Sequence, residues 1–248
     1  MLREGRIADA KSKGKDNAVS EVSHQGHRER MKQRCLEEGL DSFADHEVLE
    51  LLLFYALPYQ DTNGLAHRLL DTFGSLSAVL NADYSELLRV NGVGRHTAAL
   101  LSFMPDLLRR YQMDQFGPRP NLSTLARAGD YCCSLFLGKN YECFYMICLD
   151  VQGNLNQAAL IGEGSLSNVS VYPRIAAETA LRHRAASVIL THNHPGGNPQ
   201  ASRDDLDVTD TVARALAAVG VDVLDHIIVA RGQYYSLAQK GLIKGKLS

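Results

Sequence analysis

The pattern of residues 185–220 constrains the fold more than any other part of the chain. Residues 185–191 (AASVILT) form a short apolar run rich in β-branched residues, which is typical of a buried strand. Residues 195–199 (PGGNP) cannot continue that strand and must redirect the chain. Apolar residues then recur at helical spacing up to Val219, and Gly220 stands where a helix would end. The segment is therefore expected to fold as a strand, a stiff loop and a helix.

Three side chains with metal-binding atoms lie at this corner. His192 and His194 are two residues apart, so in an extended chain they point to the same side, with Asn193 turned away. Asp205 falls in the first turn of the expected helix, from which its carboxylate can swing back over the strand end. Two imidazoles and one carboxylate leave a fourth tetrahedral position for water, as in catalytic rather than structural zinc sites. The spacing therefore predicts a hydrolytic zinc site on these three residues.

Parts of this pattern also have purely structural explanations. Ser202 and Asp205 fit a helix-capping pattern, and an acidic first turn is favoured by the helix dipole. A pair of histidines two residues apart can likewise end an ordinary strand. Their combination at one corner favours the metal site. The motifs of zinc deaminases and of thermolysin-type proteases are absent from the sequence.

The first half of the chain has helical apolar spacing from His27 to about Tyr111, which predicts an all-α domain. Within it, residues 87–100 (LLRVNGVGRHTAAL) resemble a helix-hairpin-helix. Gly92 and Gly94 would allow a tight turn that exposes backbone N–H groups to a phosphate. Residues 21–111, however, carry 9 Lys and Arg against 13 Asp and Glu.

Phosphate-driven binding needs a basic face, and only Arg95 and His96 flank the turn. A weak nucleic-acid site on Gly92, Gly94 and Arg95 is therefore the lesser alternative. A hairpin that serves as a scaffold or a protein-docking surface is favoured.

Four segments are expected along the chain. They are a disordered tail at 1–22, the helical domain at 23–111, a linker at 112–122 and a second domain at 123–248. The polar tail lacks periodicity, and the linker contains Phe-Gly-Pro-Arg-Pro. The second domain has a mixed pattern, which makes the protein α+β. Its expected helices are 123–137, 173–183 and the one ending at Val219; its expected strands are 142–150, 154–161, 185–191 and 221–230, with a last strand and helix from Gln233.

Composition agrees with a cytoplasmic globular protein. The chain of 248 residues is 45% hydrophobic and 22% charged, with no run of 18 apolar residues and no signal-peptide pattern, so no membrane partner is expected. Its five cysteines include no Cys-x-x-Cys, which argues against a disulfide framework and a zinc ribbon. Cys143 and Cys148 are expected in the core, and His46, His67 and His226 are expected to make structural hydrogen bonds.

His192-x-His194-Pro195 followed by Ser202-x-x-Asp205 resembles the metal motif of the JAB/MPN (JAMM) metalloprotease domain. The surrounding sequence is similar to the bacterial RadC branch of that family. The matching segments are 26–30 (GHRER), 43–47 (FADHE), 51–55 (LLLFY), 73–76 (FGSL), 164–166 (GSL), 172–174 (YPR) and 225–229 (DHIIV). The resemblance implies an MPN-type mixed sheet flanked by helices, zinc on His192, His194 and Asp205, and Ser202 as a donor to the oxyanion.

The resemblance also implies a glutamate as general base on an earlier strand. Around position 159, where we expect it, the chain has Ala159. Glu163 is the only acid in that strand, and strand parity places it on the same face as Ala159. Glu163 is therefore predicted to be the catalytic base.

The leading expectation for function is a zinc-dependent metallopeptidase that cleaves peptide or isopeptide bonds through metal-activated water. The helical domain would recruit a protein or peptide substrate. One alternative is a non-enzymatic DNA-associated factor whose metal is structural. Another is a degenerate interaction module that binds metal without proteolysis, which Ala159 would favour.

Overall fold

The computed structural model describes residues 26–164, 173–244 and 247 of the chain. The expected disordered tail, residues 1–22, lies outside these residues. Most of the resembling segment 164–166 and the first residue of 172–174 lie outside them too.

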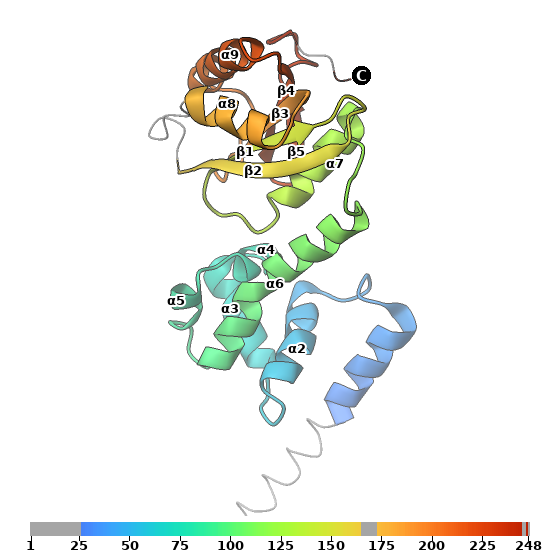
Figure 1. Cartoon of the computed structure of the whole chain (residues 1–248). Coiled ribbons are helices and arrows are strands. Elements are labelled where there is room, and N and C mark those ends of the chain that lie inside the picture. The colour runs from blue at the N-terminus through green and yellow to red at the C-terminus, as the bar shows by residue number, and fades with distance from the viewer. Residues whose placement is uncertain (1–25, 165–172, 245–246, 248) are drawn as a thin grey trace, which may run out of the picture. The chain divides into compact units, whose positions relative to one another are not determined.

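The chain forms two compact units, Met1–Met104 and Pro105–Ser248 (Figure 1). The division falls inside helix α6 and not in the linker expected at residues 112–122. Each unit is described by itself. Across the described residues, the helices are too short or too polar to cross a membrane.

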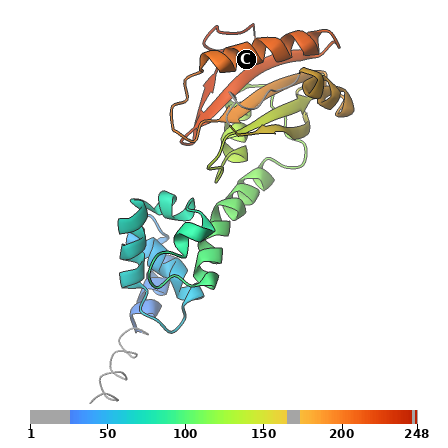
Figure 2. The same cartoon turned by 90° about the vertical axis from the view of Figure 1, so that its left-hand side faces the viewer.

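The first unit contains helices and turns but no strand over residues 26–104, as expected (Figure 2). Its helices lie at residues 26–38, α2 (Asp45–Ala56), α3 (Asn63–Phe73), α4 (Leu76–Leu80), α5 (Tyr84–Leu87) and the start of α6 (Arg95–Gln115). Leucines at helical spacing form its core, and Leu49, Leu53 and Leu69 are fully buried. Gly74 ends α3 in the left-handed conformation, with φ of +91°.

The second unit is built on a five-stranded mixed sheet in the order β2-β1-β3-β4-β5. The strands are β1 (Cys143–Leu149), β2 (Leu155–Glu163), β3 (Ser187–Asn193), β4 (Asp222–Ala230) and β5 (Gln233–Ser236). Only β3 and β4 pair in parallel, because helix α9 (Arg203–Ala217) connects them as a crossover. The mixed sheet with helices confirms the expected α+β fold.

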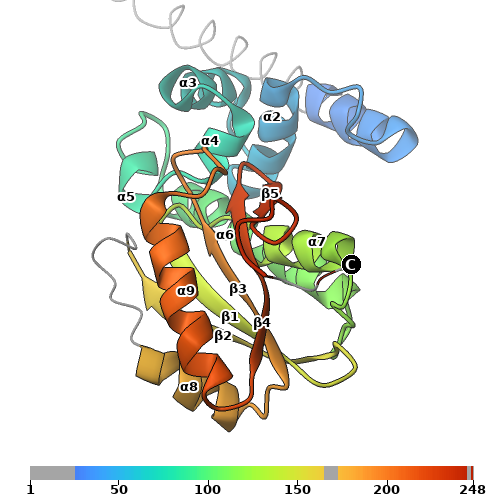
Figure 3. The same cartoon turned by 90° about the horizontal axis from the view of Figure 1, so that it is seen from above.

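Helices cover both faces of this sheet (Figures 1 and 3). Side chains of β1 alternate between the two faces. Cys143 and Ile147 pack in the cluster that contains α7 (Leu125–Leu135), whereas Phe144 and Met146 pack with α8 (Pro173–Arg182) and α9. The central strands are therefore buried on both sides. Cys143 and Cys148 are buried core residues, as expected.

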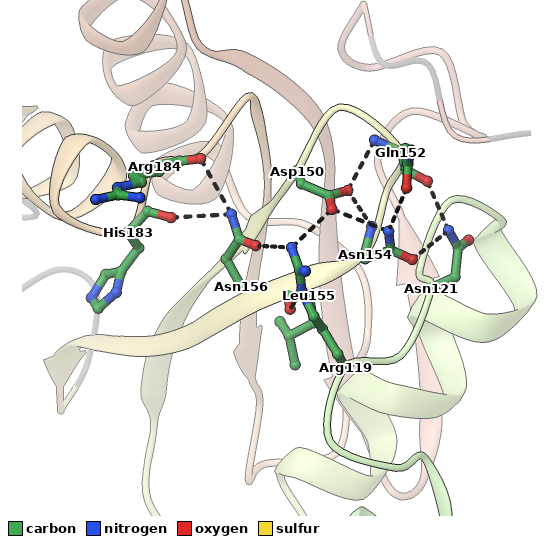
Figure 4. Close-up of polar contacts among 9 residues, drawn as sticks. All are labelled: Arg119, Asn121, Asp150, Gln152, Asn154, Leu155, Asn156, His183 and Arg184. Carbon is green, nitrogen blue, oxygen red and sulfur yellow. Dashed lines mark hydrogen bonds and ion pairs between the residues drawn. The ribbon is translucent and has the colours of Figure 1, made fainter.

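The segment expected as a linker is ordered within the second unit. Helix α6 continues to Gln115, and residues 119–122 lie alongside the turn of the β1–β2 hairpin (Figure 4). Arg119 donates to Asp150 Oδ2 at 2.9 Å and to Asn156 Oδ1 at 2.8 Å. Backbone bonds join Leu122 to Gly153 and Leu155 to Pro120. The helix ends before the two prolines, and the polar residues between and after them, Arg119 and Asn121, pair with the hairpin, although the Arg119 side chain is still 58% exposed.

The helix expected after the last strand is also corrected. Residues 237–242 form turns, closed by Gly241 N–H to Ala238 O and by Leu242 N–H to Leu237 O. Gly241 has φ of +70°, which a regular helix does not accommodate.

Candidate metal centre

Strand β3 positions both histidines on one face of the sheet. His192 lies opposite Phe144 of β1, and their rings stack with centroids 5.8 Å apart. The His194 N–H donates to Val229 O at 2.8 Å, which continues the pairing beyond the strand end. Asn193 points to the other face, where its Oδ1 accepts from Cys143 N–H at 2.8 Å. The expected i, i+2 arrangement is therefore present.

Helix α9 brings the third side chain to the same corner. Ser202 is its N-cap: the Ser202 hydroxyl accepts from the Asp205 N–H at 3.1 Å and donates to Asp205 Oδ2 at 2.7 Å. The Ser202 N–H donates to the same Oδ2 at 2.7 Å. The capping explanation is therefore correct, and the cap itself holds the Asp205 carboxylate towards the histidines.

The three side chains converge tightly. His192 Nε2 lies 2.8 Å from His194 Nε2 and 3.1 Å from Asp205 Oδ1, and His194 Nε2 lies 3.7 Å from Asp205 Oδ2. His192 and Asp205 are each 1% exposed, whereas His194 is partly exposed. Across the described residues, this is the only group of three His, Cys, Asp or Glu side chains that could hold one metal ion.

Hydrogen bonding and charge at the corner fit a cation. His194 Nδ1 lies 2.7 Å from Asn198 O, and because a carbonyl only accepts, Nδ1 carries the proton and Nε2 presents its lone pair. Burial would raise the pKa of Asp205, but His192 and the Ser202 donors outweigh burial and hold that pKa well below its usual value. Burial lowers the pKa of His192 despite the neighbouring carboxylate. The neutral imidazole of His192, the Nε2 lone pair of His194 and the carboxylate of Asp205 therefore face one another, as zinc ligands do.

Glu163 does not belong to this site, and its assignment as the base is corrected. The side chain is exposed, and its Oε1 accepts from Tyr141 Oη at 3.3 Å. The β1–β2 register shifts between Phe144 and Tyr145, which leaves Ile161 as an extra residue in β2. This bulge reverses the parity beyond it, so Glu163 lies opposite Cys143, on the sheet face away from His192.

A different acid lies on the face of the histidines. Glu142 precedes β1 and is two residues before Phe144, so it shares the face of Phe144 and His192. Continuing the β1–β3 register by two residues places Glu142 opposite His194. The side chain is half-buried, and its charge raises the pKa of His192, an effect smaller than those of burial, Asp205 and His194.

Glu142 was not predicted from the sequence, because the resemblance pointed to an acid around position 159, in the second strand of the domain. The signal that could have found it is the parity of Glu142 with Phe144 at the start of the first strand.

Nucleic-acid binding by the hairpin of the helical unit stays a secondary prediction. Residues 88–94 connect α5 to α6, with Gly92 at φ of +96°, and Gly94 O accepts from Ala98 N–H in the first turn of α6, which begins at Arg95. The neighbouring groove is lined by both signs of charge: Arg68, Asp71, Glu86 and Arg89. That lining does not favour phosphate, so only weak nucleic-acid binding is still expected.

Comparison with known proteins identifies the family. Residues 122–242 match the model of the RadC-like JAB domain, and residues 22–99 match the UPF0758 N-terminal domain. A UPF0758 protein of Rhodobacter capsulatus is 36% identical over 213 residues, which cover 86% of this chain and all of the relative. UPF0758 protein FN0909 of Fusobacterium nucleatum is 32% identical over 232 residues, which cover 91% of this chain and all of the relative. These names state no activity, but both domains and both relatives agree that the chain belongs to the RadC family.

Proposed function

We propose that this chain is a zinc-dependent hydrolase of peptide or isopeptide bonds. The observation that carries the proposal is the convergence of His192 Nε2, His194 Nε2 and the Asp205 carboxylate, with Glu142 on the same sheet face. Zinc supplies Lewis-acid chemistry, since it brings the pKa of water down to about 7 and polarises a carbonyl group.

The protein residues would divide the remaining work. Glu142 would take a proton from the attacking water and pass it to the departing amine, a role that contributes about 10²–10⁴-fold in rate. Ser202 would donate to the developing oxyanion, a contribution of about 3–4 kcal/mol for one donor in other enzymes. Because its hydroxyl bonds to Asp205 Oδ2, this role requires the hydroxyl to exchange partners.

The helical unit would recruit the protein that is cleaved. Its groove of mixed charge fits a protein surface better than a phosphate backbone. A cytoplasmic location is consistent with five cysteines that are all free of disulfides. The position of Glu142 also weakens the case for a silent module, because Ala159 no longer implies a missing base.

The test uses Glu142→Gln with Glu163→Gln as its matched control. Zinc-loaded full-length protein is incubated with a peptide library and with an isopeptide-linked conjugate, and new amino termini are detected by mass spectrometry. Wild type and Glu163→Gln should cleave, whereas Glu142→Gln should retain zinc and lose about two orders of magnitude or more in rate. Activity lost in Glu163→Gln and kept in Glu142→Gln would overturn the assignment of the base. Zinc binding without cleavage by wild type would support the silent module.

A further inference from the structure

A chain of buried hydrogen bonds lies behind His192, on the side away from the other ligands. His192 Nδ1 lies 2.8 Å from His226 Nε2, and His226 Nδ1 lies 2.5 Å from Thr209 Oγ1. Thr209 Oγ1 also lies 2.5 Å from Asp205 O. His226 comes from β4 and is fully buried, and Thr209 comes from α9 and is 1% exposed. This series of hydrogen bonds therefore links two of the three proposed ligands, His192 and Asp205, through side chains that do not face the metal position.

The Asp205 carbonyl oxygen, at which this series of hydrogen bonds ends, determines the direction of each of them. A carbonyl oxygen only accepts, so the single hydroxyl proton of Thr209 goes to Asp205 O. The same hydroxyl oxygen must then accept from His226, which places the proton of His226 on Nδ1. His226 Nε2 is left as an acceptor, so His192 carries its proton on Nδ1. The lone pair of His192 Nε2 consequently points towards His194 and Asp205.

We infer that Thr209 and His226 are positioning residues that fix His192 in the tautomer able to bind a metal ion. Neither touches the metal position; both act through the ring of His192. In the opposite setting His192 Nε2–H could donate to Asp205 Oδ1 at 3.1 Å, but Thr209 would donate to His226 and its 2.5 Å contact with Asp205 O would hold no proton. Phe144 packs against both imidazoles, with ring centroids 5.8 Å from His192 and 5.5 Å from His226, and offers neither ring another polar partner. The inference rests on the metal site of the proposed function and not on the hydrolysis.

Loss of the threonine hydroxyl has a specific consequence. In Thr209→Val the Nδ1–H of His226 has no acceptor, so a proton on Nε2 becomes the better choice for His226. That proton faces His192 Nδ1, which must then accept. His192 moves its own proton to Nε2, where it blocks the metal position. Changes to groups that orient a ligand typically reduce metal affinity about 10–100-fold.

The experiment reads the tautomer and the affinity separately. Full-length protein labelled with ¹⁵N-histidine is stripped of metal, and long-range ¹H–¹⁵N spectra report which ring nitrogen of His192 is protonated. Zinc affinity is then measured by competition with a chromophoric chelator. Thr209→Ser keeps the hydroxyl and should behave as wild type. Thr211→Val is the matched control, because Thr211 also donates to the carbonyl four residues earlier in α9, at 2.8 Å, but is exposed and bonds no histidine.

Wild type, Thr209→Ser and Thr211→Val should show His192 protonated on Nδ1 and should bind zinc alike. Thr209→Val should show the proton on Nε2 and bind zinc about 10–100-fold more weakly. If Thr209→Val does not fold, His226→Gln and His226→Leu replace it: the glutamine retains an acceptor for His192 and should bind more tightly than the leucine.

The inference is overturned if wild-type His192 is protonated on Nε2, if wild type binds no zinc, or if Thr209→Val leaves both readouts unchanged. An equal loss of affinity in Thr211→Val would also overturn it. Wild type that binds zinc but cleaves no substrate would contradict only the proposed hydrolysis.

Discussion

Replacement of Ser202 by alanine tests whether the helix cap and the metal ligand are one structural unit. The change removes the N-cap bond from Asp205 N–H and the bond from the hydroxyl to Asp205 Oδ2, but leaves the backbone bond from residue 202 to Oδ2. A lost N-cap costs about 1 kcal/mol. Loss of a hydrogen bond to a charged group adds about 1 kcal/mol, which is below the usual range of about 1.5–3 kcal/mol because Ser202 is exposed.

The free energy of unfolding should therefore fall by about 2 kcal/mol, and Tm by about 4–8 °C for a chain of this size. Urea unfolding followed by circular dichroism measures the change. Ser75→Ala is a control for a cap that holds no carboxylate, because Ser75 accepts from Ala78 N–H at 3.2 Å at the start of α4 and otherwise bonds only the exposed Ser77 hydroxyl, at 3.1 Å. It should cost about 1 kcal/mol, and Ser202→Thr should recover most of the loss. Equal effects of Ser202→Ala and Ser75→Ala would refute the bond to Asp205.

Three further predictions address the ligand set, the hairpin and the packing of the second unit. Asp205→Ala should weaken zinc retention and the exposed neighbour variant Asp204→Ala should not; the reverse result in dialysis and elemental analysis would contradict the ligand set. Duplex DNA binding should be weak and steeply salt-dependent, and Arg95→Glu should abolish it; tight binding at physiological salt in fluorescence anisotropy would contradict this. Gly129→Ala should destabilise the fold by about 1–3 kcal/mol, because a Cβ there would lie 2.3 Å from the Tyr234 ring, whereas Gly196→Ala has open space and should be neutral in the same unfolding assay.

Most of the fold follows from the sequence because its strands and helices have clear periodicity. Strand β1 is a continuous apolar run, β3 contains the apolar residues Val188–Leu190, and α9 follows a capping residue, so their bounds could be expected within a few residues. The convergence of His192, His194 and Asp205 follows from the same local rules, since the i, i+2 parity and the first helical turn determine where the side chains point.

The errors arise where backbone geometry departs from regular periodicity. A bulge at Ile161 places Glu163 on the sheet face away from His192, and the residue pattern of β2 does not predict this bulge. The acid on the correct face, Glu142, lies just outside the regular strand, where periodicity carries little information. The linker and the chain end depend on bonds to segments far away in the sequence, as between Arg119 and Asp150, which local patterns do not contain.

The buried hydrogen bonds behind His192 could be predicted only in part. His226 was expected to make structural hydrogen bonds, and it does, to His192 and Thr209. Its position behind His192, a proposed metal ligand, depends on the parallel pairing of β3 with β4, which places Ile228 rather than His226 opposite His192. The contact between the two rings is diagonal across the strands, a relation that the sequence does not specify.

The central claim, that this corner is a metal site, is tested most directly by the zinc content of purified protein. Elemental analysis should find about one zinc per chain in wild type and none in the double variant His192→Ala/His194→Ala. The control is His46→Ala/His67→Ala, which removes the stacked histidine pair of the helical unit, with ring centroids 4.5 Å apart, and should leave zinc unchanged. Wild type free of zinc after growth with the metal, or zinc retained by His192→Ala/His194→Ala and lost from the control, would contradict the account.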